Sequence, residues 1–233
     1  MTAFRYIIED FKSVIERDPA INSKVELFFN YPGLWAIFWY RIAHSLHKKN
    51  FKITAKVIMG VSQILTNMDI NPAATIGRRV FIDHGIGVVI GETAEVGDDV
   101  TIYQGVTLGG VSLNKGKRHP TIESGAVIGS GAKVLGNITV GANAKVGANS
   151  VVIRDVPPEC TAVGVPARVI KKGEDKSPLS HNNLPNISNE VFEYLIKRIA
   201  KLESILQQTH PETEIFDKNL DVAYEDFLKS VKK

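Results

Sequence analysis

The sequence predicts a mainly β protein built around a parallel β-helix, with an α-helical segment before it and a helical extension after it. Three observations lead to this class. Aliphatic residues recur at every sixth position from Ile122 to Val152. Seventeen of the nineteen glycines lie between Gly77 and Gly173, where a six-residue repeat needs tight corners. Both ends of the chain instead show apolar residues at helical spacing.

The six-residue repeat occurs in two runs. The second run is unbroken and consists of Ile122, Ile128, Val134, Val140, Val146 and Val152. The first run contains Ile70, Ile76 and Ile82, slips by two residues, and continues with Ile90, Val96, Ile102 and Leu108. Three hexapeptides make one triangular coil, so the two runs predict about five coils, each burying its aliphatic positions against its neighbours.

The predicted domains follow from these patterns. Residues 1–68 form an α-helical N-terminal domain, with helices expected over residues 1–16, 34–49 and 51–66. Residues 69–172 form the β-helix, and residues 173–233 are a linker followed by a helical extension. The extension contains a heptad seam, which consists of Phe192, Leu195, Ile199, Leu202 and Leu206. This helix either packs on its own subunit or, as we hypothesise, forms a coiled coil that stabilises an oligomer.

Composition excludes several classes of protein. A net charge of +3 over 233 residues gives no argument for nucleic-acid binding. The longest apolar stretch, Leu34 to Tyr40, is too short to span a membrane, and the start of the chain does not resemble a secretory signal, so a cytoplasmic location is expected. Only His84 and His119 lie in the predicted β-helix, and Cys160 is the only cysteine, so no metal site is expected.

A histidine and two aspartates form the first candidate site. Asp83 and His84 stand where the first run slips, and a histidine held beside a carboxylate on a rigid scaffold can act as a general base. Asp69 lies nearly one coil earlier, so stacking brings it near His84, where a carboxylate would fix the tautomer of the ring. The alternative interpretation is an exposed corner pair without chemistry.

The second candidate site lies in the excursion between the two runs, roughly Gly109 to Thr121. Loops that leave a regular scaffold carry function more often than the scaffold does. Arg118 offers a planar fork that suits a carboxylate or a phosphate, and His119 can donate a hydrogen bond or accept a proton. The alternative is a solvated loop, which spacing alone favours.

Several motifs together resemble the serine O-acetyltransferase family, from residue 17 to about residue 172. The motifs are Arg17-Asp18-Pro19-Ala20, Asp69-Ile70-Asn71-Pro72-Ala73-Ala74, Phe81-Ile82-Asp83-His84, Gly91-Glu92-Thr93-Ala94, Val106-Thr107-Leu108-Gly109-Gly110, Arg118-His119-Pro120 and Gly164-Val165-Pro166-Ala167-Arg168. The resemblance implies a left-handed coil and transfer of acetyl from acetyl-CoA to the hydroxyl of L-serine, which gives O-acetyl-L-serine for cysteine biosynthesis.

The resemblance also implies a role for each site residue. His84 is the general base, Asp69 holds it, and the backbone N–H of Gly110 stabilises the oxyanion. Asp18 and Asp83 bind the serine ammonium group, Arg118 binds its carboxylate, His119 hydrogen-bonds the substrate, and Glu92 is a supporting residue. CoA lies in a groove between coils, and the positions matching that groove are Thr107, Gly109, Ser130, Gly131 and Ala148. The small residues among them let the pantetheine arm approach the backbone.

The family further implies a homotrimer with the active site between neighbouring subunits, and feedback inhibition by L-cysteine. A hexamer is in doubt because the helical N-terminal block is shorter than in the family's long members. A complex with O-acetylserine sulfhydrylase is not supported, since the chain ends in Lys233 and lacks the terminal isoleucine used for that contact. Two alternatives stay open: a hexapeptide acetyltransferase that acts on a sugar or antibiotic hydroxyl, and a catalytically silent scaffold.

Overall fold

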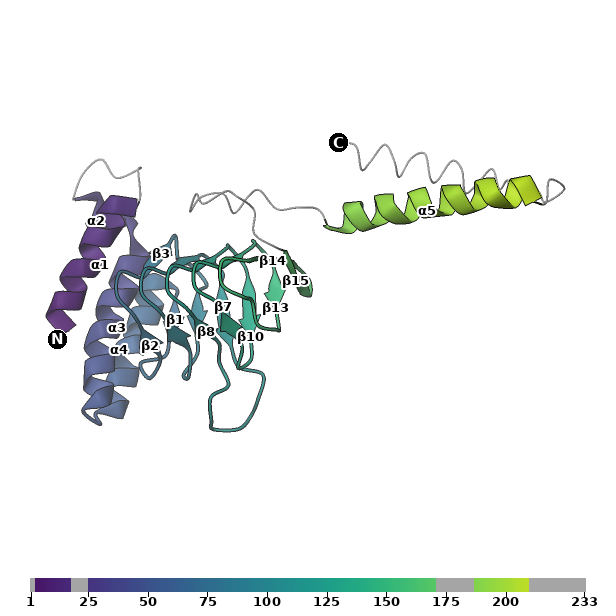
Figure 1. Ribbon diagram of the computed structural model, residues 1–233. Helices are drawn as coiled ribbons and strands as arrows, with labels where there is room; N and C mark the ends of the chain where they lie inside the picture. Colours follow the sequence, from purple (N-terminus) through teal and green to yellow (C-terminus); the bar gives the residue numbers. More distant parts are fainter. Residues whose placement is uncertain (1–2, 18–24, 171–186, 210–233) are drawn as a thin grey trace. The chain divides into compact units, whose positions relative to one another are not determined.

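The computed structural model describes residues 3–17, 25–170 and 187–209 (Figure 1). The chain divides into two compact units, Met1–Asn183 and Leu184–Lys233. Among the described residues, the first unit contains four helices and the β-helix, and the second contains one long helix. The predicted class, a mainly β chain with a parallel β-helix between helical segments, is confirmed.

Helices α1 (Ala3–Arg17), α3 (Pro32–Lys48) and α4 (Lys52–Thr66) confirm the three helices predicted for the N-terminal segment. They lie together at the β1 end of the β-helix (Figure 1). Pro32 occupies the first turn of α3, where its missing N–H costs no hydrogen bond. The short helix α2 (Glu26–Asn30) was not predicted, because five residues are too few to show a helical period.

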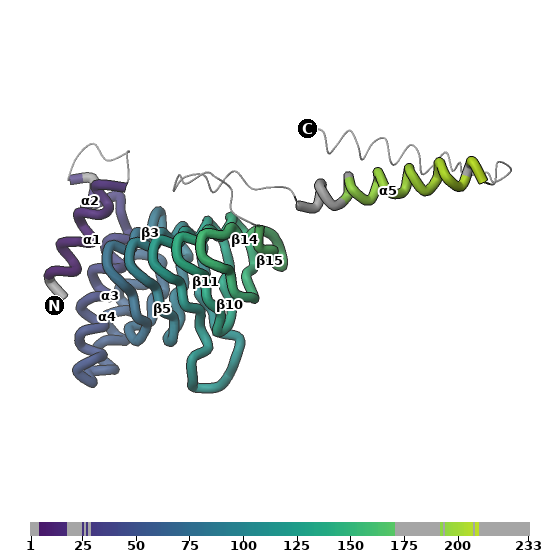
Figure 2. Tube along the Cα trace, in the orientation of Figure 1, coloured from purple at the N-terminus to yellow at the C-terminus, as the bar shows by residue number. Residues whose placement is uncertain are grey.

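The β-helix consists of three sheets whose strands pair in parallel from coil to coil, except for the antiparallel strand β15. Figure 2 shows the stacked coils. The first sheet contains β1 (Asp69–Ile70), β4 (Val89–Ile90), β7 (Thr107–Gly109), β10 (Lys133–Leu135) and β13 (Val151–Val152). The second contains β2 (Thr75–Ile76), β5 (Glu95–Val96), β8 (Thr121–Ile122) and β11 (Thr139–Val140). The third contains β3 (Phe81–Asp83), β6 (Thr101–Tyr103), β9 (Val127–Ile128), β12 (Lys145–Val146), β14 (Thr161–Gly164) and β15 (Ala167–Ile170).

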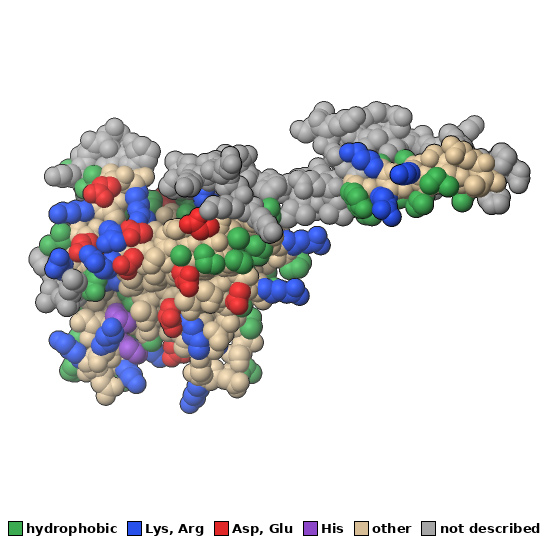
Figure 3. All heavy atoms as spheres, viewed as in Figure 1, with side chains coloured by type: hydrophobic (Ala, Val, Ile, Leu, Met, Phe, Trp, Pro, Cys, Tyr) green, Lys and Arg blue, Asp and Glu red, His purple; other side chains and the backbone are tan. Residues whose placement is uncertain are grey.

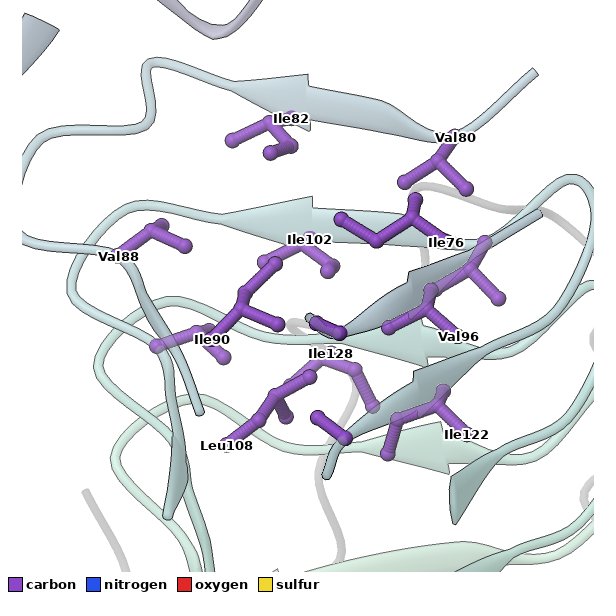
Figure 4. Close-up of a cluster of buried hydrophobic side chains, with 14 of the residues drawn as sticks. Ile76, Val80, Ile82, Val88, Ile90, Val96, Ile102, Leu108, Ile122 and Ile128 are labelled. Atoms are coloured by element: carbon purple, nitrogen blue, oxygen red, sulfur yellow. The ribbon is translucent and has the colours of Figure 1, made fainter. Parts of the chain in front are cut away.

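The aliphatic positions of the repeat form the core. Every aliphatic residue named for the two runs is buried, and the side chains from all three sheets point to one interior column (Figure 4). Strands of two or three residues bury little surface alone. Each coil is therefore stabilised by stacking on the coils before and after it, as expected for a solenoid.

Two coils are longer than the others, and both lie where the sequence predicts an irregularity. Asp69 pairs with Val89, so the first coil is two residues longer than the three hexapeptides that separate Val89 from its partner Thr107. Thr107 pairs with Lys133, which makes the third coil eight residues longer than a regular one. Those eight residues form the loop that projects from the β-helix between β7 and β8 (Figure 2).

Helix α3 covers the start of the β-helix with two polar side chains. The Tyr40 hydroxyl donates to Ala74 O at 2.6 Å and accepts from Ile76 N–H at 3.0 Å. The buried Arg41 guanidinium donates to Ile76 O at 2.6 Å and pairs with both carboxylate oxygens of Asp10 at 3.0 and 3.2 Å. These contacts satisfy backbone groups that an uncovered first coil would leave without partners.

The other end of the β-helix is closed by a change of strand direction. Strand β14 pairs in parallel with β12, but β15 turns back and pairs with β14 in an antiparallel register, Thr161 opposite Ile170. The parallel ladder of the third sheet therefore ends at β14.

In the second unit, α5 (Ile187–Thr209) confirms the predicted helix of the extension. Its seam residues Phe192, Leu195, Ile199, Leu202 and Leu206 are all exposed, and hydrophobic and basic side chains lie side by side on its visible face (Figure 3). None of the helices described is long and apolar enough to cross a bilayer. The cytoplasmic location stays a prediction.

Candidate active site

The predicted base, His84, is the first of the five residues that connect β3 to β4. Its backbone is left-handed, with φ of 57°, and its side chain is 74% exposed. The ring Nε2 lies 3.9 Å from Asp83 Oδ1. Gly85 follows with a φ of 68°, a left-handed conformation that L side chains rarely adopt, so this position favours glycine. A rigid turn therefore presents the His84 ring to solvent, where it is open to a substrate hydroxyl.

Asp69 lies alongside this turn. Gly87 N–H donates to Asn67 O at 2.8 Å, and Asp69 N–H donates to Val88 O at 2.9 Å. The stacking predicted from the repeat therefore places Asp69 in the strand next to the His84 turn. Among the described residues, no hydrogen bond or ion pair joins the Asp69 carboxylate to the His84 ring.

The His84 turn begins a column of tight corners between the third and first sheets. Gly87, Gly105, Gly131 and Asn149 follow one another along it, all with positive φ. Gly105 N–H donates to Ile86 O, Gly131 N–H to Gln104 O, and Asn149 N–H to Ser130 O, each at 2.8 Å. The predicted CoA residues Ser130, Gly131 and Ala148 lie in this column, which we call the His84 corner. A Cβ on Gly131 would lie 2.1 Å from Asn149 Oδ1, so there is little space for a side chain at this position of the corner.

Thr107 and Gly109 belong to β7, which leads away from the His84 corner. The Thr107 hydroxyl accepts a hydrogen bond from Lys133 Nζ at 3.1 Å. Lys133 also donates to the backbone oxygen of Gly105. Four of the five predicted CoA residues are partly exposed polar or glycine positions, and the fifth is Ala148, so a thioester arm would meet little side-chain bulk here.

The projecting loop is fastened to the turn between β4 and β5. Arg118 donates to Glu92 Oε2 at 2.7 Å, and Lys117 Nζ lies 3.0 Å from Glu95 Oε1 and donates to Thr93 O at 2.8 Å. Glu92, predicted as a supporting residue, therefore contacts the guanidinium of Arg118. Because Arg118 remains partly exposed, its fork is accessible to a second carboxylate.

His119 is the most buried polar residue of the loop, with 8% of its surface exposed. Burial, followed by the nearby positive charge of Arg118, lowers its pKa, which favours the neutral ring. The ring is packed between two glycines. A Cβ on Gly91 would lie 2.1 Å from the ring Nε2, and one on Gly110 would lie 3.2 Å from the same atom.

Gly110 places a backbone donor next to this ring. Across the described part of the chain, no hydrogen bond uses the Gly110 N–H. The Gly110 N–H, the His119 Nε2 and the Arg118 guanidinium therefore gather in one place, which we call the His119 cluster together with Glu92 and Gly91. A pair of donors beside a cationic fork suits a substrate that carries a carboxylate or develops an oxyanion.

The structure does not bring all the predicted residues together. The His84 corner joins the third sheet to the first, whereas the His119 cluster stands where the first sheet passes into the second. The strands of the first sheet separate the two groups within one chain. Asp18 lies outside the described residues. Sequence analysis missed Gly91 and Thr93 as site residues, although stacking one coil on the next would have placed both beside His119.

Other features of the surface do not compete with these two groups. A shallow cavity of about 450 Å³ lies over the second sheet, lined by residues that include Thr75, Glu95 and Glu123 and none of the predicted site residues. Within the described ranges, no group of three or more His, Cys, Asp or Glu side chains is placed to hold a metal ion.

The chain is similar to known proteins in sequence. Residues 119–154 match the family of bacterial transferase hexapeptides (six repeats). The serine acetyltransferase of Bacillus pumilus is 50% identical over 205 residues, which cover 87% of this chain and 94% of that protein.

Solved structures give the same result. A serine acetyltransferase in complex with cysteine has a TM-score of 0.74 at 41% identity, over 78% of this chain and 72% of that one. The Neisseria gonorrhoeae serine acetyltransferase in complex with serine has a TM-score of 0.69 at 42% identity, over 72% and 69%. A serine acetyltransferase in complex with CoA has a TM-score of 0.67 at 43% identity, over 72% and 69%. With this identity over nearly the whole of a curated relative, the chain belongs to the serine acetyltransferase family.

Proposed function

We propose that this protein transfers the acetyl group of acetyl-CoA to the hydroxyl of L-serine and releases O-acetyl-L-serine and CoA. The observation that carries the proposal is the His119 cluster. It holds a guanidinium, a buried histidine and a backbone N–H around one small space, which suits an amino-acid carboxylate better than a sugar. Relatives bound to serine and to CoA support both substrates.

The chemistry requires a base because a serine hydroxyl is a weak nucleophile at neutral pH. In the proposed mechanism His84 takes the hydroxyl proton as the oxygen attacks the thioester carbonyl of acetyl-CoA. The C–S bond then breaks, CoA leaves as a thiolate, and His84 returns the proton to that sulfur. Asp69 stabilises the imidazolium that forms between these two steps. The Gly110 N–H stabilises the tetrahedral oxyanion.

The substrates are held by groups on both sides of the reacting atoms. Asp18 and Asp83 bind the serine ammonium group, and Arg118 and His119 bind the carboxylate. Acetyl-CoA runs along the His84 corner past Ser130, Gly131 and Ala148, with Thr107 and Gly109 beside its thioester. Slim residues at this corner leave room for the pantetheine arm close to the backbone.

The separation of the two groups within one chain supports a shared site. Because β strands of the first sheet stand between the His84 corner and the His119 cluster, we infer that each complete site uses His84 of one subunit and His119 of its neighbour. A closed trimer provides three such sites. L-Cysteine resembles L-serine in every group that these residues bind, so we infer that it inhibits by occupying the serine position, in line with the relative bound to cysteine.

An assay of thiol release from acetyl-CoA against a panel of acceptors tests the proposed function. We expect turnover with L-serine, and none with sugars or with an aminoglycoside at equal concentration. Acetylation of a sugar in the absence of serine turnover would overturn the proposal and favour the alternative hexapeptide acetyltransferase. An inert protein would favour the scaffold.

Replacing Arg118 tests the binding of the serine carboxylate. Arg118→Ala removes the fork and leaves Glu92 without its partner, so we expect KM for L-serine to rise by about a hundredfold, with KM for acetyl-CoA unchanged. Arg118→Lys keeps the charge but not the fork and should recover part of the loss. Arg154→Ala, on the exposed surface beyond β13, is the matched control. An unchanged KM for serine in Arg118→Ala would exclude the assigned role.

Removing residues 186–233 tests the hypothesis that α5 stabilises the trimer. We expect the truncated chain to dissociate at a higher protein concentration than the full chain, as measured by sedimentation velocity. Two heptads give a modest contribution, so the effect should be clearest near the dissociation midpoint. Leu195→Glu combined with Leu202→Glu in the full chain should reproduce it. An equally stable trimer after truncation would refute the hypothesis.

A further inference from the structure

Thr93 makes five contacts with the loop segment Lys117–His119. Its hydroxyl accepts hydrogen bonds from the backbone N–H groups of Arg118, at 3.0 Å, and His119, at 3.1 Å. The same hydroxyl oxygen lies 2.9 Å from His119 Nδ1, and the Thr93 backbone N–H donates to that nitrogen at 3.2 Å. The Thr93 carbonyl accepts from Lys117 Nζ at 2.8 Å. A single threonine therefore fixes three consecutive residues of the loop.

The number of donor and acceptor sites on the Thr93 hydroxyl determines which atom donates in its contact with His119 Nδ1. A threonine hydroxyl has two acceptor sites and one proton. The two backbone N–H groups occupy both acceptor sites, so the proton points to the only other partner in reach, His119 Nδ1. A nitrogen that accepts from both a hydroxyl and a backbone N–H carries no proton of its own. The proton of the neutral ring is therefore on Nε2.

We propose that Thr93 is a positioning residue that locks His119 in the Nε2–H tautomer and so makes it a hydrogen-bond donor to the substrate carboxylate instead of a base. This proposal rests on the proposed function for its kinetic consequence only. The Nε2 atom is the one that lies beside Gly91 and Gly110. The pKa of His119, lowered by burial and then by the charge of Arg118, agrees with a ring that carries a single proton.

The fixed tautomer of His119 explains why His119 and His84 have different roles in the proposed mechanism. A ring whose Nε2 bears the proton can accept a second proton only at Nδ1, which Thr93 contacts, and burial and the charge of Arg118 disfavour the resulting cation. His84 is exposed in its turn and lies outside this set of hydrogen bonds. The two histidines of the site therefore differ in role because their partners differ.

Thr93→Val and Thr93→Ser form the test pair. Valine keeps the shape and removes the hydroxyl, whereas serine keeps the hydroxyl. We expect Thr93→Val to lower kcat/KM for L-serine by about ten- to a hundredfold, mainly through KM for serine, with KM for acetyl-CoA unchanged. Thr93→Ser should stay within about threefold of the unmodified protein. Thr75→Val is the matched control, since the described contacts give the Thr75 hydroxyl no hydrogen bond and it lies one coil earlier.

The tautomer itself is read from the ring nitrogens by two-dimensional 1H–15N NMR, with His119→Gln used to assign the signals. We expect the unmodified protein to show a protonated Nε2 and an unprotonated Nδ1, and Thr93→Val to show a mixture. This readout needs neither acceptor nor turnover, so it tests the lock even if the protein acetylates another acceptor or Thr93→Val does not fold. An Nδ1–H ring in the unmodified protein, or equal kinetic losses in the valine and serine variants, would overturn the proposal.

Discussion

Replacing His84 with asparagine should lower kcat for acetyl transfer to L-serine by a factor of about 10²–10⁴, the range supplied by a positioned general base. Asparagine is the better probe than alanine because His84 has a φ of 57°, and asparagine tolerates the left-handed region. The side chain is 74% exposed, so the free energy of unfolding should change little. KM for acetyl-CoA should stay the same, because no interaction with CoA is lost.

The measurement is steady-state thiol release at saturating acetyl-CoA and L-serine, combined with thermal unfolding of each variant. Glu159→Asn is the control, because Glu159 is also exposed at a left-handed corner, with φ of 61°, and lies far along the chain from His84. A His84→Asn protein that keeps kcat within threefold of the starting value would show that the base is another group. It would also favour the interpretation of Asp83 and His84 as an exposed corner pair without chemistry.

A methyl group on Gly91 should disable the His119 cluster. The added Cβ would lie 2.0 Å from Cδ2 and 2.1 Å from Nε2 of His119, so the ring must leave its place. A displacement of that size near reacting groups costs about a hundredfold, and we expect this loss in kcat/KM for L-serine. Gly91 lacks a positive φ, so alanine adds no backbone strain and the effect comes from the ring.

A double-mutant cycle separates this cause from a general loss of stability. In a His119→Ala background there is no ring to displace, so Gly91→Ala should change kcat/KM for serine by less than about threefold. Gly116→Ala, in the same loop with nothing within 4 Å of the added Cβ, is the control and should behave like the starting protein. Additive losses from Gly91→Ala and His119→Ala would mean that the two residues act independently.

The fold could be predicted from the sequence because its period is set by packing. One aliphatic residue per six must point inward for the coils to stack, so Ile122 or Val134 can be assigned to the core by counting alone. The two irregularities were predicted for the same reason: they interrupt the count. Helix α2 was not predicted, because five residues are too few to show the helical spacing of apolar residues.

The site could be predicted only in part. The six-residue repeat determines which backbone positions stack on one another, but it does not determine where their side chains point. Register puts Asp69 beside the His84 turn, yet rotamers decide whether the carboxylate meets the ring. The pairing of Glu95 with Thr121 could also have predicted the contact between Thr93 and His119, because these two residues lie two places before the paired ones. The hydroxyl's contact with Nδ1 and the pairing of Arg118 with Glu92 required coordinates.

The two closed ends of the β-helix limit how this protein can assemble. A stack of parallel coils exposes ladder groups at both ends and could grow into a fibre by adding a second molecule end to end. Here Tyr40 and Arg41 occupy the backbone groups at the first coil, and the reversed strand β15 blocks parallel continuation of the third sheet. Neighbouring molecules are thus left with lateral contacts, and in the trimer that we propose such contacts would close a ring of fixed size with a constant number of shared sites.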